Sequence, residues 1–542
     1  MKKHNYLKVA LWVIPIIILC FAIFARDQKW AYVVNLVLAF IESGILLYRF
    51  KDENNALKVV LATMLCFVLL SWIIPAAVFS SEYIDQGRVQ VGLFDVFNYS
   101  LTSLSYFGYI GFFFLLVGGF YGILYKIPAY RSFLDKIVAG AKGKEKVVLG
   151  IMVVVISLLV SICGLQIGYA LFIPLVVAII LLMGYDKIVA ALVIVGSMIA
   201  GLAGATYASS NTSYLVQSFG LNNDYEIGVR FIILLVGVAL VIFNTLMYIK
   251  NVKPAVAKKT VKKVADKKKT SKNSKAAAKE EVIVVKEEKD SSEFVPASVS
   301  KKHKVWPFVV TFALLFILMV LAFIPWGETG FGIKLFDDVT TNVQGYELFG
   351  FPIFAKLLGT INSFGNWTIT DLLFPMALVI ALLMILYKVN FNDMLDGFVS
   401  GVKKALAPAA IVLAVYTILV LVTYHPYQLT LYNVILGEKF NIARTALAAI
   451  LSGVFNSDMH YAFQSIIPYY SQTIVKTNAS LSAILFQSMY GWSMLVAPTS
   501  LILMGTLAYL KVSYRDWLKA VWKLLLELFV ILLIVLLILA MI

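Results

Sequence analysis

The sequence predicts an all-α polytopic membrane protein with two related halves, and three observations support this fold class. The chain has 542 residues, of which 61% are hydrophobic and only 14% are charged, whereas soluble domains carry about 25% charged residues. Apolar runs of roughly 18 or more residues recur along the chain, and each can cross a hydrocarbon core of about 30 Å. A lysine-rich stretch without apolar periodicity separates these runs into two sets.

The apolar runs predict about 13 membrane spans, give or take two. In chain order the expected spans are 7–25, 30–48, 59–79, 107–125, 147–163, 169–183, 188–206, 230–249, 305–325, 371–388, 405–424, a broken run at 480–510, and 519–541. Residues 445–474 are expected to form a re-entrant hairpin, because each arm is only about ten residues long. The first run lacks a small-residue cleavage site and leads directly into the second, so we expect a retained hairpin and not a signal peptide.

Four regions follow from this pattern. They are an N-terminal transmembrane hairpin at 1–58, a first transport half at 59–249, a disordered lysine-rich linker at 250–304 and a second transport half at 305–542. The linker holds 17 lysines and 7 acidic residues, so it contributes +10 of the formal net charge of +16. Such a segment cannot bury enough apolar surface to fold. We therefore expect a tether and no nucleic-acid partner, and deletion of Val256–Glu293 is expected to leave uptake intact.

Lysine-rich loops predict the orientation of the chain in a plasma membrane. The basic segments fall on one side of the expected spans, and they are 1–8, 49–58, 126–146, 250–304 and 511–523. The opposite loops are longer and poor in lysine, and they are 81–106, 207–229, 326–370 and 425–444. Because cytoplasmic loops carry an excess of lysine and arginine, the N-terminus and the linker are expected in the cytoplasm.

Two pairs of similar segments indicate an internal duplication. LDKIVAGAKGKEK from Leu134 resembles LDGFVSGVKKAL from Leu395, and VGLFDVF from Val91 resembles IKLFDDV from Ile333. Internal repeats are common in secondary transporters. The span count makes the repeats parallel, and one miscounted hairpin would make them inverted.

Polar residues interrupt the apolar runs at two places in each half. The interruptions are SICGLQIGY from Ser161, GLAGATYASSNTSY from Gly201, NSDMHYAFQSIIPYY from Asn456 and YGWSMLVAPTS from Tyr490. Non-helical backbone is tolerated at membrane depth only where protein or water covers it. We therefore expect these breaks to converge around a water-filled cavity, where helix N-termini favour an anionic group and freed oxygens hold a cation. The expected substrate-binding residues are Gln166, Ser209, Ser210, Asn211, Thr212, Asn456, Ser457, Gln464, Thr499 and Ser500.

Asp458 and His460 are the expected ion- or proton-coupling residues. A carboxylate at membrane depth costs roughly 2.5–3.5 kcal/mol and usually marks ion or proton traffic, and histidine changes charge near neutral pH. Simpler interpretations stay open: an aqueous loop for this pair, interfacial helix caps for 209–213 and a kink at Pro498. The other acid within an apolar run, Glu42, belongs to the N-terminal hairpin and ranks lower.

Catalytic and metal-binding signatures are missing from the sequence. Cys20, Cys66 and Cys163 show no pairing or ligand pattern. There is no phosphate-binding P-loop, G-x-S-x-G or H-E-x-x-H motif. We expect a carrier without cofactor or metal, and keep a membrane-embedded enzyme and a non-transporting membrane scaffold as alternatives from other classes.

The order of motifs resembles the DcuC/YfcC-type carriers, a family of secondary transporters in the larger ion-transporter superfamily. The motifs of the first half are WIIPAAVF from Trp72, VGLFDVF, LLVGGFYGIL, GAKGKEKVV and IPLVVAIILLMGYD. Those of the second half are DGFVSGVKKAL, IIPYYSQTIV and APTSLILMGTLAYLKVSYRDWLK. The resemblance covers about 59–530 outside the linker. It implies a carrier of organic anions or amino acids that is coupled to H⁺ or Na⁺ or works as an exchanger, with the solute near paired re-entrant tips and a homodimer left open.

The chain departs from the family pattern at the second tip, and this bears on the solute. The tip reads Asn456-Ser457-Asp458-Met459-His460, where the family tends to have glycine and serine. The predicted membrane core also contains almost no arginine or lysine, so a dicarboxylate would depend on helix ends and hydroxyls. An unpaired Asp458 favours a cation or zwitterion. The expected solute is an amino acid or peptide-like zwitterion, with a C4-dicarboxylate or other organic anion as the alternative.

Overall fold

A computed structural model describes residues 56–79, 83–251, 293–298, 303–327, 330–437, 440–473 and 479–541, together with seven isolated positions before residue 56. The expected N-terminal hairpin, Glu42 and most of the linker lie outside the described residues.

Within the described residues, seven helices are long and apolar enough to cross a membrane. They are α3 (Ala56–Ile73), α4 (Leu93–Leu124), α6 (Glu145–Cys163), α11 (Ile227–Asn251), α13 (Trp306–Phe323), α17 (Phe391–Tyr424) and α23 (Tyr514–Met541). Each overlaps an expected span, but α4 and α17 both begin 14 residues before the expected start, and the first part of α4 lies in the expected loop 81–106. Three other expected spans, at 169–183, 188–206 and 371–388, are short or interrupted helices instead, so the count of full-length spans in the described region was too high. The run at 480–510 is broken, as expected, into α21 and α22.

Shorter elements fill the space between the long helices. They are α5 (Pro128–Ala141), the 3₁₀ turn η1 (Gly168–Leu171), α7 (Ile173–Leu182), α8 (Lys187–Ala191), the π-helical turn η2 (Leu192–Gly196), α9 (Ser197–Ala203), α10 (Ser209–Phe219), α14 (Leu335–Gly345), α15 (Ile353–Leu358), α16 (Leu373–Tyr387), α18 (Tyr427–Leu436), α19 (Ile442–Phe455), α20 (Met459–Thr473), α21 (Ala479–Ser493) and α22 (Leu501–Leu510). The all-α expectation missed one feature: β1 (Ala76–Phe79) and β2 (Tyr83–Gly87) pair antiparallel, where the chain leaves α3 and turns back toward α4.

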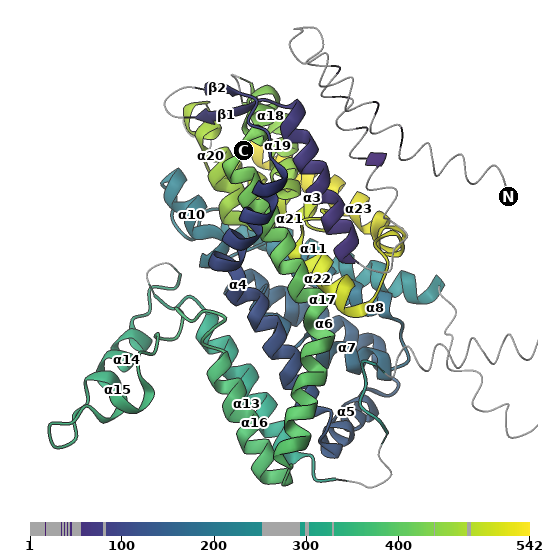
Figure 1. The fold of residues 1–542 in the computed structure, drawn as a ribbon, viewed down its shortest axis with the longest axis vertical. Coiled ribbons are helices and arrows are strands. Elements are labelled where there is room, and N and C mark those ends of the chain that lie inside the picture. The colour runs from purple at the N-terminus through teal and green to yellow at the C-terminus, as the bar shows by residue number, and fades with distance from the viewer. Residues whose placement is uncertain are drawn as a thin grey trace, which may run out of the picture.

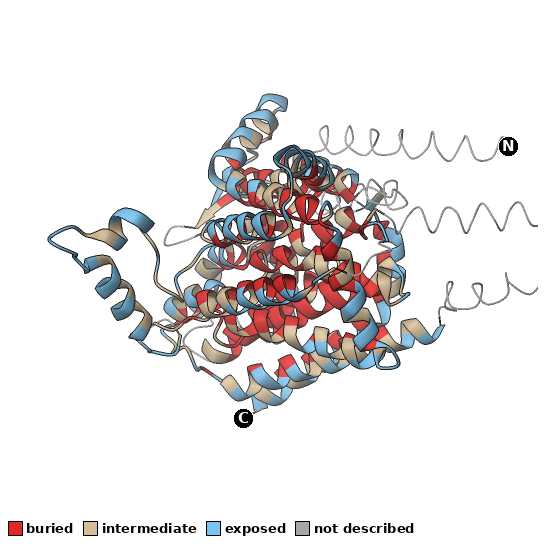
Figure 2. Cartoon of the chain, turned by 90° about the horizontal axis from the view of Figure 1, so that it is seen from below, coloured by how far each residue is buried: buried red, intermediate tan, exposed pale blue. Residues whose placement is uncertain are grey.

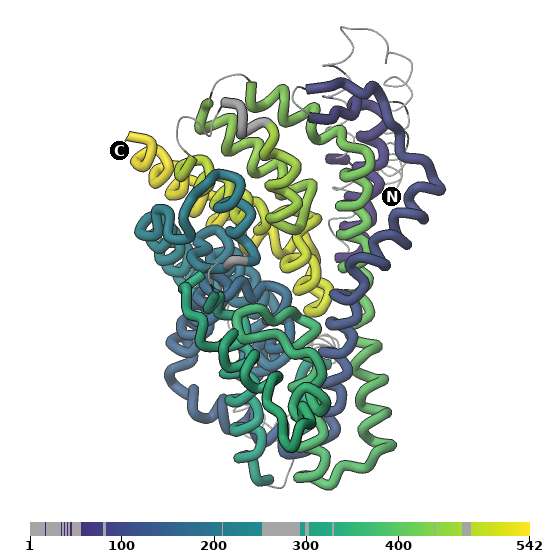
Figure 3. Tube along the Cα trace, turned by 90° about the vertical axis from the view of Figure 1, so that its left-hand side faces the viewer, coloured from purple at the N-terminus to yellow at the C-terminus, as the bar shows by residue number. Residues whose placement is uncertain are grey.

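The longest helices, α4 and α17, run side by side over the height of the molecule (Figures 1 and 3). Their closest approach is at Gly118 and Gly122 on α4 and at Gly397 and Gly401 on α17. A Cβ atom added to Gly122 would lie 2.1 Å from the carbonyl oxygen of Gly397. Small residues four apart let two membrane helices come into backbone contact. The two glycine pairs lie in LLVGGFYGIL and DGFVSGVKKAL.

The two helices are antiparallel. Gly122, near the C-terminal end of α4, meets Gly397 near the start of α17. At the other end, the Tyr99 hydroxyl lies 2.6 Å from Nε2 of His425, which directly follows α17.

The order of elements after α4 recurs after α17. In both segments a long helix leads to a short helix, a helical hairpin with an unwound tip, an interrupted helix and a final long helix. The first set runs from α4 to α11 and the second from α17 to α23. Since the equivalent helices α4 and α17 are antiparallel, the repeat is inverted, and the parallel arrangement from the span count is wrong. The matched motifs are not equivalent positions either, because Leu134 lies in α5 and Leu395 lies in α17.

The buried residues gather where the two sets of elements meet. Figure 2 shows the buried residues in the middle of the helical body, with exposed residues on its periphery. The pair α14 and α15 stands away from this body (Figures 1 and 2), and both helices lack buried residues. The broken elements α9 and α21, which pack on each other, lie inside the body.

Candidate functional site

The first hairpin, α6 and α7, has its unwound tip beside the interruption between α9 and α10. We call residues 204–208 the first break. Helix α6 ends at Gly164, whose φ of +66° lies in the left-handed region that favours glycine. The Ser161 carbonyl accepts hydrogen bonds from the amides of Thr206 (2.8 Å) and Ala208 (3.2 Å). The Ser161 hydroxyl donates to the Gly204 carbonyl at 2.7 Å. These bonds cover backbone groups that a regular helix would satisfy by itself.

An amide pair extends this contact from the first tip into α10. The Gln166 Nε2 donates to Oδ1 of Asn211 at 2.9 Å. Asn211 is buried, and its Nδ2 atom has no hydrogen-bond partner among the described residues. Helix α10 begins without a side-chain cap. The first break therefore presents unused donors, which suit an anionic group.

The second hairpin, α19 and α20, has the same relation to the interruption between α21 and α22. We call residues 494–500 the second break. The Thr499 hydroxyl lies 3.1 Å from the Gly453 carbonyl and 2.8 Å from the Val454 carbonyl. The Leu501 amide donates to the Ser457 hydroxyl at 3.0 Å. Each half thus ties a hairpin tip to the break that follows it.

Aromatic contacts join α10, which follows the first break, to α20, which follows the second tip. The Tyr214 ring lies 4.5 Å from the His460 ring and 5.7 Å from the Phe463 ring, centroid to centroid. Phe219 also contacts Phe463, at 5.3 Å. Helix α20, which begins directly after the tip at 456–458, therefore packs against α10, and the shared site stays a prediction.

Asp458 is the N-terminal cap of α20. Its Oδ1 accepts hydrogen bonds from the amides of His460 (2.9 Å) and Tyr461 (3.4 Å), a geometry that stabilises a helix N-terminus. The side chain is half-buried, and the hydroxyls of Tyr416 and Tyr490 are close enough to interact with it electrostatically. Asp458 thus lies at the start of a helix and not within a loop.

Asp458 and His460 are not joined side chain to side chain. The exposed imidazole lies at an angle of 55° to the Tyr214 ring and meets the Tyr461 ring edge-on at 5.5 Å. The coupling role of the pair stays a prediction.

The structure divides the other expected site residues into three groups. Buried members of the breaks and tips are Asn211, Thr212, Asn456, Thr499 and Ser500, and half-buried ones are Gln166 and Ser457. Ser210 and Gln464 are exposed, while only the backbone of Ser209 is described. Two of the buried hydroxyls are used locally: Thr212 donates to the Ala208 carbonyl (3.1 Å), and Ser500 caps α22 through the Leu503 amide (3.4 Å).

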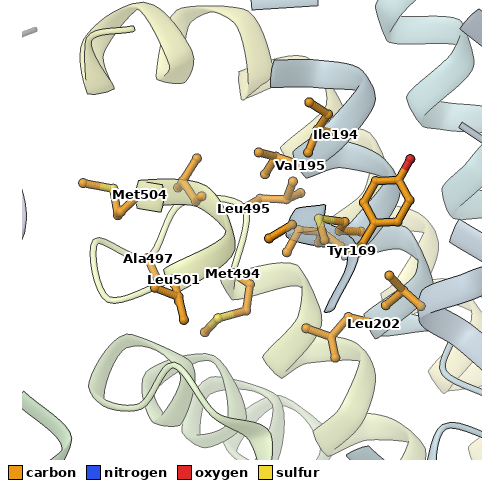
Figure 4. Packing of buried hydrophobic residues seen from close by; sticks show 14 of the residues in the cluster. Tyr169, Ile194, Val195, Leu202, Met494, Leu495, Ala497, Leu501 and Met504 are labelled. Carbon is orange, nitrogen blue, oxygen red and sulfur yellow. The ribbon is translucent and has the colours of Figure 1, made fainter. Parts of the chain in front are cut away.

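Apolar side chains, and not a wide aqueous cavity, fill the space between the two breaks. Figure 4 shows the side chains of this cluster, with Ile194, Val195 and Leu202 from the first half and Met494, Leu495, Ala497, Leu501 and Met504 from the second. A cavity of about 60 Å³ lies beside the cluster. It is lined by Gln166 and Ile167 of the first tip, by Thr506 and Tyr509 of α22, and by residues of α4 and α17. The expected wet cavity is reduced in this conformation to room for a few water molecules.

Arg230 is a buried cation that the sequence reasoning missed. It lies in the first turn of α11 and is completely buried. Its Nε donates to the Ala205 carbonyl in the first break at 2.9 Å, and its Nη1 donates to the carbonyls of Asn223 and Tyr225, both at 3.0 Å. Its Nη2 has no partner, and no carboxylate lies within salt-bridge distance in the described part of the chain. Asp224 is close enough to interact electrostatically.

Trp517 occupies the equivalent position in the second half. It lies in the first turn of α23, is completely buried, and donates from Nε1 to the Leu495 carbonyl in the second break at 2.8 Å. Each break is thus held by an N–H donor from the long helix that follows it. Because the neutral indole does this in the second half, holding the break does not require a charge.

A buried amide also ties the two halves together. Gln487 on α21 donates from Nε2 to the carbonyls of Ala203 (3.2 Å) and Ala205 (2.9 Å), and its Oε1 accepts from the Tyr225 hydroxyl at 3.2 Å. In the sequence, Gln487 could have been noticed only as a single amide within an apolar run. Arg230 could have been noticed only as a cation at the boundary of the expected span 230–249.

Comparisons with known proteins give one family match and two more distant similarities. A family model described as "DcuC: C4-dicarboxylate anaerobic carrier" matches residues 54–541. The chain is similar to the "Putative basic amino acid antiporter YfcC" of Escherichia coli (strain K12), with 27% identity over 205 residues, which are 35% of this chain and 39% of that protein. The match thus spans less than half of that relative. Among solved structures, the Alcanivorax borkumensis YdaH transporter aligns over 88% of this chain and 97% of its own, with 12% identity and a TM-score of 0.36.

Proposed function

Because the chain belongs to the DcuC carrier family, it is a multi-pass membrane transporter and not an enzyme, and we propose that it is a secondary carrier of amino acids. The proposed solute has a free carboxylate and at least one ammonium group, and a basic amino acid fits best. The coupling uses H⁺ or Na⁺, or exchange of one solute for another.

The observation that supports this proposal is that a buried cation lies at the first break and a carboxylate lies at the second tip. The buried guanidinium of Arg230 lies at the first break, and the half-buried carboxylate of Asp458 lies at the second tip. Charges that are shielded from water interact strongly with a complementary group. A zwitterion can pair with both charges, with its carboxylate toward Arg230 at the first break and its ammonium group toward Asp458 at the second tip.

Neutral polar groups lie beside each of the two charges of the proposed site. Unused donors at the first break come from the Asn211 amide and the uncapped start of α10. The second tip offers the oxygens of Asn456 and Ser457, and Thr499 and Ser500 keep the break beside it in place. Ser209, Ser210, Thr212 and Gln464 lie next to these groups along the chain and are second-rank candidates. Because the cavity of about 60 Å³ is too small for an amino acid, the halves must separate to admit a solute.

The name of the YfcC relative supports the same solute class, since it describes an antiporter of basic amino acids. A C4-dicarboxylate is the second candidate. The description of the family model favours it, and so does Arg230, which supplies the cation that the sequence reasoning did not find. Asp458 opposes it, because a second carboxylate would face a like charge there.

Substitution of Asp458 discriminates between the two solutes. Asparagine also caps helices, so Asp458→Asn keeps the start of α20 and removes only the charge. In proteoliposome counterflow, we expect Asp458→Asn to weaken arginine and lysine exchange at least about tenfold, which is about 1.4 kcal/mol of binding free energy. Asp186→Asn is the matched control, because Asp186 caps α8 in the same way through the Val189 amide at 2.9 Å. Succinate exchange without amino-acid exchange in the unsubstituted protein would contradict the proposal.

The orientation of the chain in the membrane is proposed from the excess of lysine and arginine on its cytoplasmic side. The side chains of Arg131, Lys187, Lys404 and Lys511 gather around residues 293–296, near the end of the linker. Because cationic loops are retained in the cytoplasm, we place this end, the linker and the N-terminus inside the cell. Protease accessibility of the linker in right-side-out and inside-out vesicles tests the placement.

A further inference from the structure

A short segment at the end of the lysine-rich linker is docked onto the helical body. In Glu293–Pro296, Phe294 and Pro296 are buried, and the exposed fraction of Phe294 is 3%. The Phe294 carbonyl accepts a hydrogen bond from the Tyr125 hydroxyl at 2.8 Å. The Pro296 carbonyl accepts one from Nη1 of Arg131 at 2.7 Å. The sequence reasoning had included this segment in a disordered tether.

The surface that receives the segment is basic and comes from both halves. Lys511 Nζ lies 2.6 and 2.7 Å from the two carboxylate oxygens of Glu293. Lys404 Nζ donates to the Glu293 carbonyl at 2.8 Å. Lys187 Nζ lies 5.0 Å from the centre of the Phe294 ring, a cation–π distance. Lys187 belongs to the first set of elements, whereas Lys404 and Lys511 belong to the second.

The docked phenylalanine packs against one residue of the small cavity's wall. Its ring centroid is 5.5 Å from that of Tyr509, and Tyr509 lines the cavity together with Gln166 and Thr506. The segment therefore contacts the cavity wall at Tyr509, beside the basic surface, and it bonds to elements of both halves.

We propose that Glu293–Pro296 is a latch, an acidic and aromatic segment that binds the basic surface of Arg131, Lys187, Lys404 and Lys511 and holds the two halves closed over the cavity at this end. Opening toward this end then requires the segment to leave. The segment binds the closed conformation more tightly than the open one. The closed population rises in proportion to this difference in affinity.

Cysteine accessibility tests the latch without any solute, so its outcome is independent of the proposed amino-acid transport. Thr506→Cys is introduced on the cavity wall of the full chain, with Cys20, Cys66 and Cys163 changed to alanine. A charged maleimide reports the labelling rate in nanodiscs, where both faces are accessible. We expect Phe294→Ala to raise the rate at least about tenfold, because loss of the buried ring shifts the population toward the open form. Lys511→Gln, a surface change that leaves the core intact, should also raise it.

The matched control is Ser298→Ala, which alters an exposed residue of the same segment. It should leave the labelling rate unchanged. The latch is refuted if Phe294→Ala and Lys511→Gln both label at the rate of the parent. An equal increase in Ser298→Ala would also refute it, since the effect would then not come from the docked contacts.

Discussion

Two side chains keep the interrupted helices of this carrier in place, and they differ in chemistry. Trp517 and Arg230 each donate to one carbonyl of a break from the first turn of the following helix. A buried carbonyl without a donor costs free energy of unfolding, and the surrounding apolar side chains offer no replacement.

Removal of the Trp517 donor should therefore destabilise the second break. Trp517→Phe keeps most of the ring volume and leaves the Leu495 carbonyl without its bond. We expect a loss of about 1–3 kcal/mol in the free energy of unfolding, measured as a lower midpoint of thermal unfolding in detergent. Trp522→Phe is the control, because the Trp522 side chain is 51% exposed. Equal midpoints for the two variants would contradict the proposed role.

Arg230 should matter for the solute as well as for the fold. Arg230→Gln keeps an N–H donor for the first break but removes the charge. We expect it to weaken the binding of every solute that carries a carboxylate by about tenfold or more, since a charge-assisted bond is roughly twice as strong as a neutral one. Competition for labelled solute in counterflow measures this loss. Arg444→Gln, at an exposed position on α19, should bind as the parent does.

At the residue scale, the sequence predicted which segments hold polar side chains but not which atoms meet. Gln166 and Asn211 were both candidates, and their hydrogen bond joins residues 45 positions apart. Arg230 escaped notice because it stands at a span boundary, where an arginine normally reaches water. Only the return of the chain after α10 buries it, and that return depends on packing.

At the scale of elements, the crossing of α4 and α17 depends on glycine. The segments LLVGGFYGIL and DGFVSGVKKAL served first as family motifs, and the structure supplies their physical reason. Their backbones touch, so even a methyl group has no space at Gly122, where the nearest carbonyl oxygen would be 2.1 Å from a Cβ atom.

Substitution of two glycines on the same helix tests this crossing. Gly122→Ala should destabilise the protein by about 1–3 kcal/mol, because the two helices must move apart. Gly111→Ala is the matched control, because its Cβ would lie 3.6 Å from the Ala409 carbonyl oxygen, an ordinary contact. Thermal unfolding in detergent compares them, and a Gly111→Ala effect as large as that of Gly122→Ala would argue against backbone contact as the cause.

Element lengths were harder to predict where helices break. The expected spans 169–183 and 188–206 are the returning arm of a hairpin and a helix that stops at the first break. A short buried helix and a full membrane span have the same apolar composition. Counting apolar runs therefore gave too many full-length spans. The hairpin at 445–474 was recognised because its arms were too short to cross.

At the scale of the whole molecule, the expected tether ends in a docked segment, Glu293–Pro296. The deletion expected to be harmless, Val256–Glu293, includes Glu293, which pairs with Lys511. The deletion that tests the tether must therefore end before Glu293. Deletion of Ala257–Lys279 leaves 18 residues between Asn251 and Glu293, enough to extend over about 60 Å. We expect uptake into cells at the parent rate, normalised to the amount of protein in the membrane. A loss of uptake by this deletion would refute the tether interpretation.

The sequence by itself determined the membrane class, the family, the positions of the long helices and the four segments where helices break. Those properties depend on apolar length and on local composition, which can be counted along the chain. The tertiary structure decided that the repeats are inverted, that a buried arginine holds the first break, and that the linker's end binds both halves. Each of these depends on contacts between residues far apart in the chain, and apolar helices of similar composition do not reveal their partners or their direction.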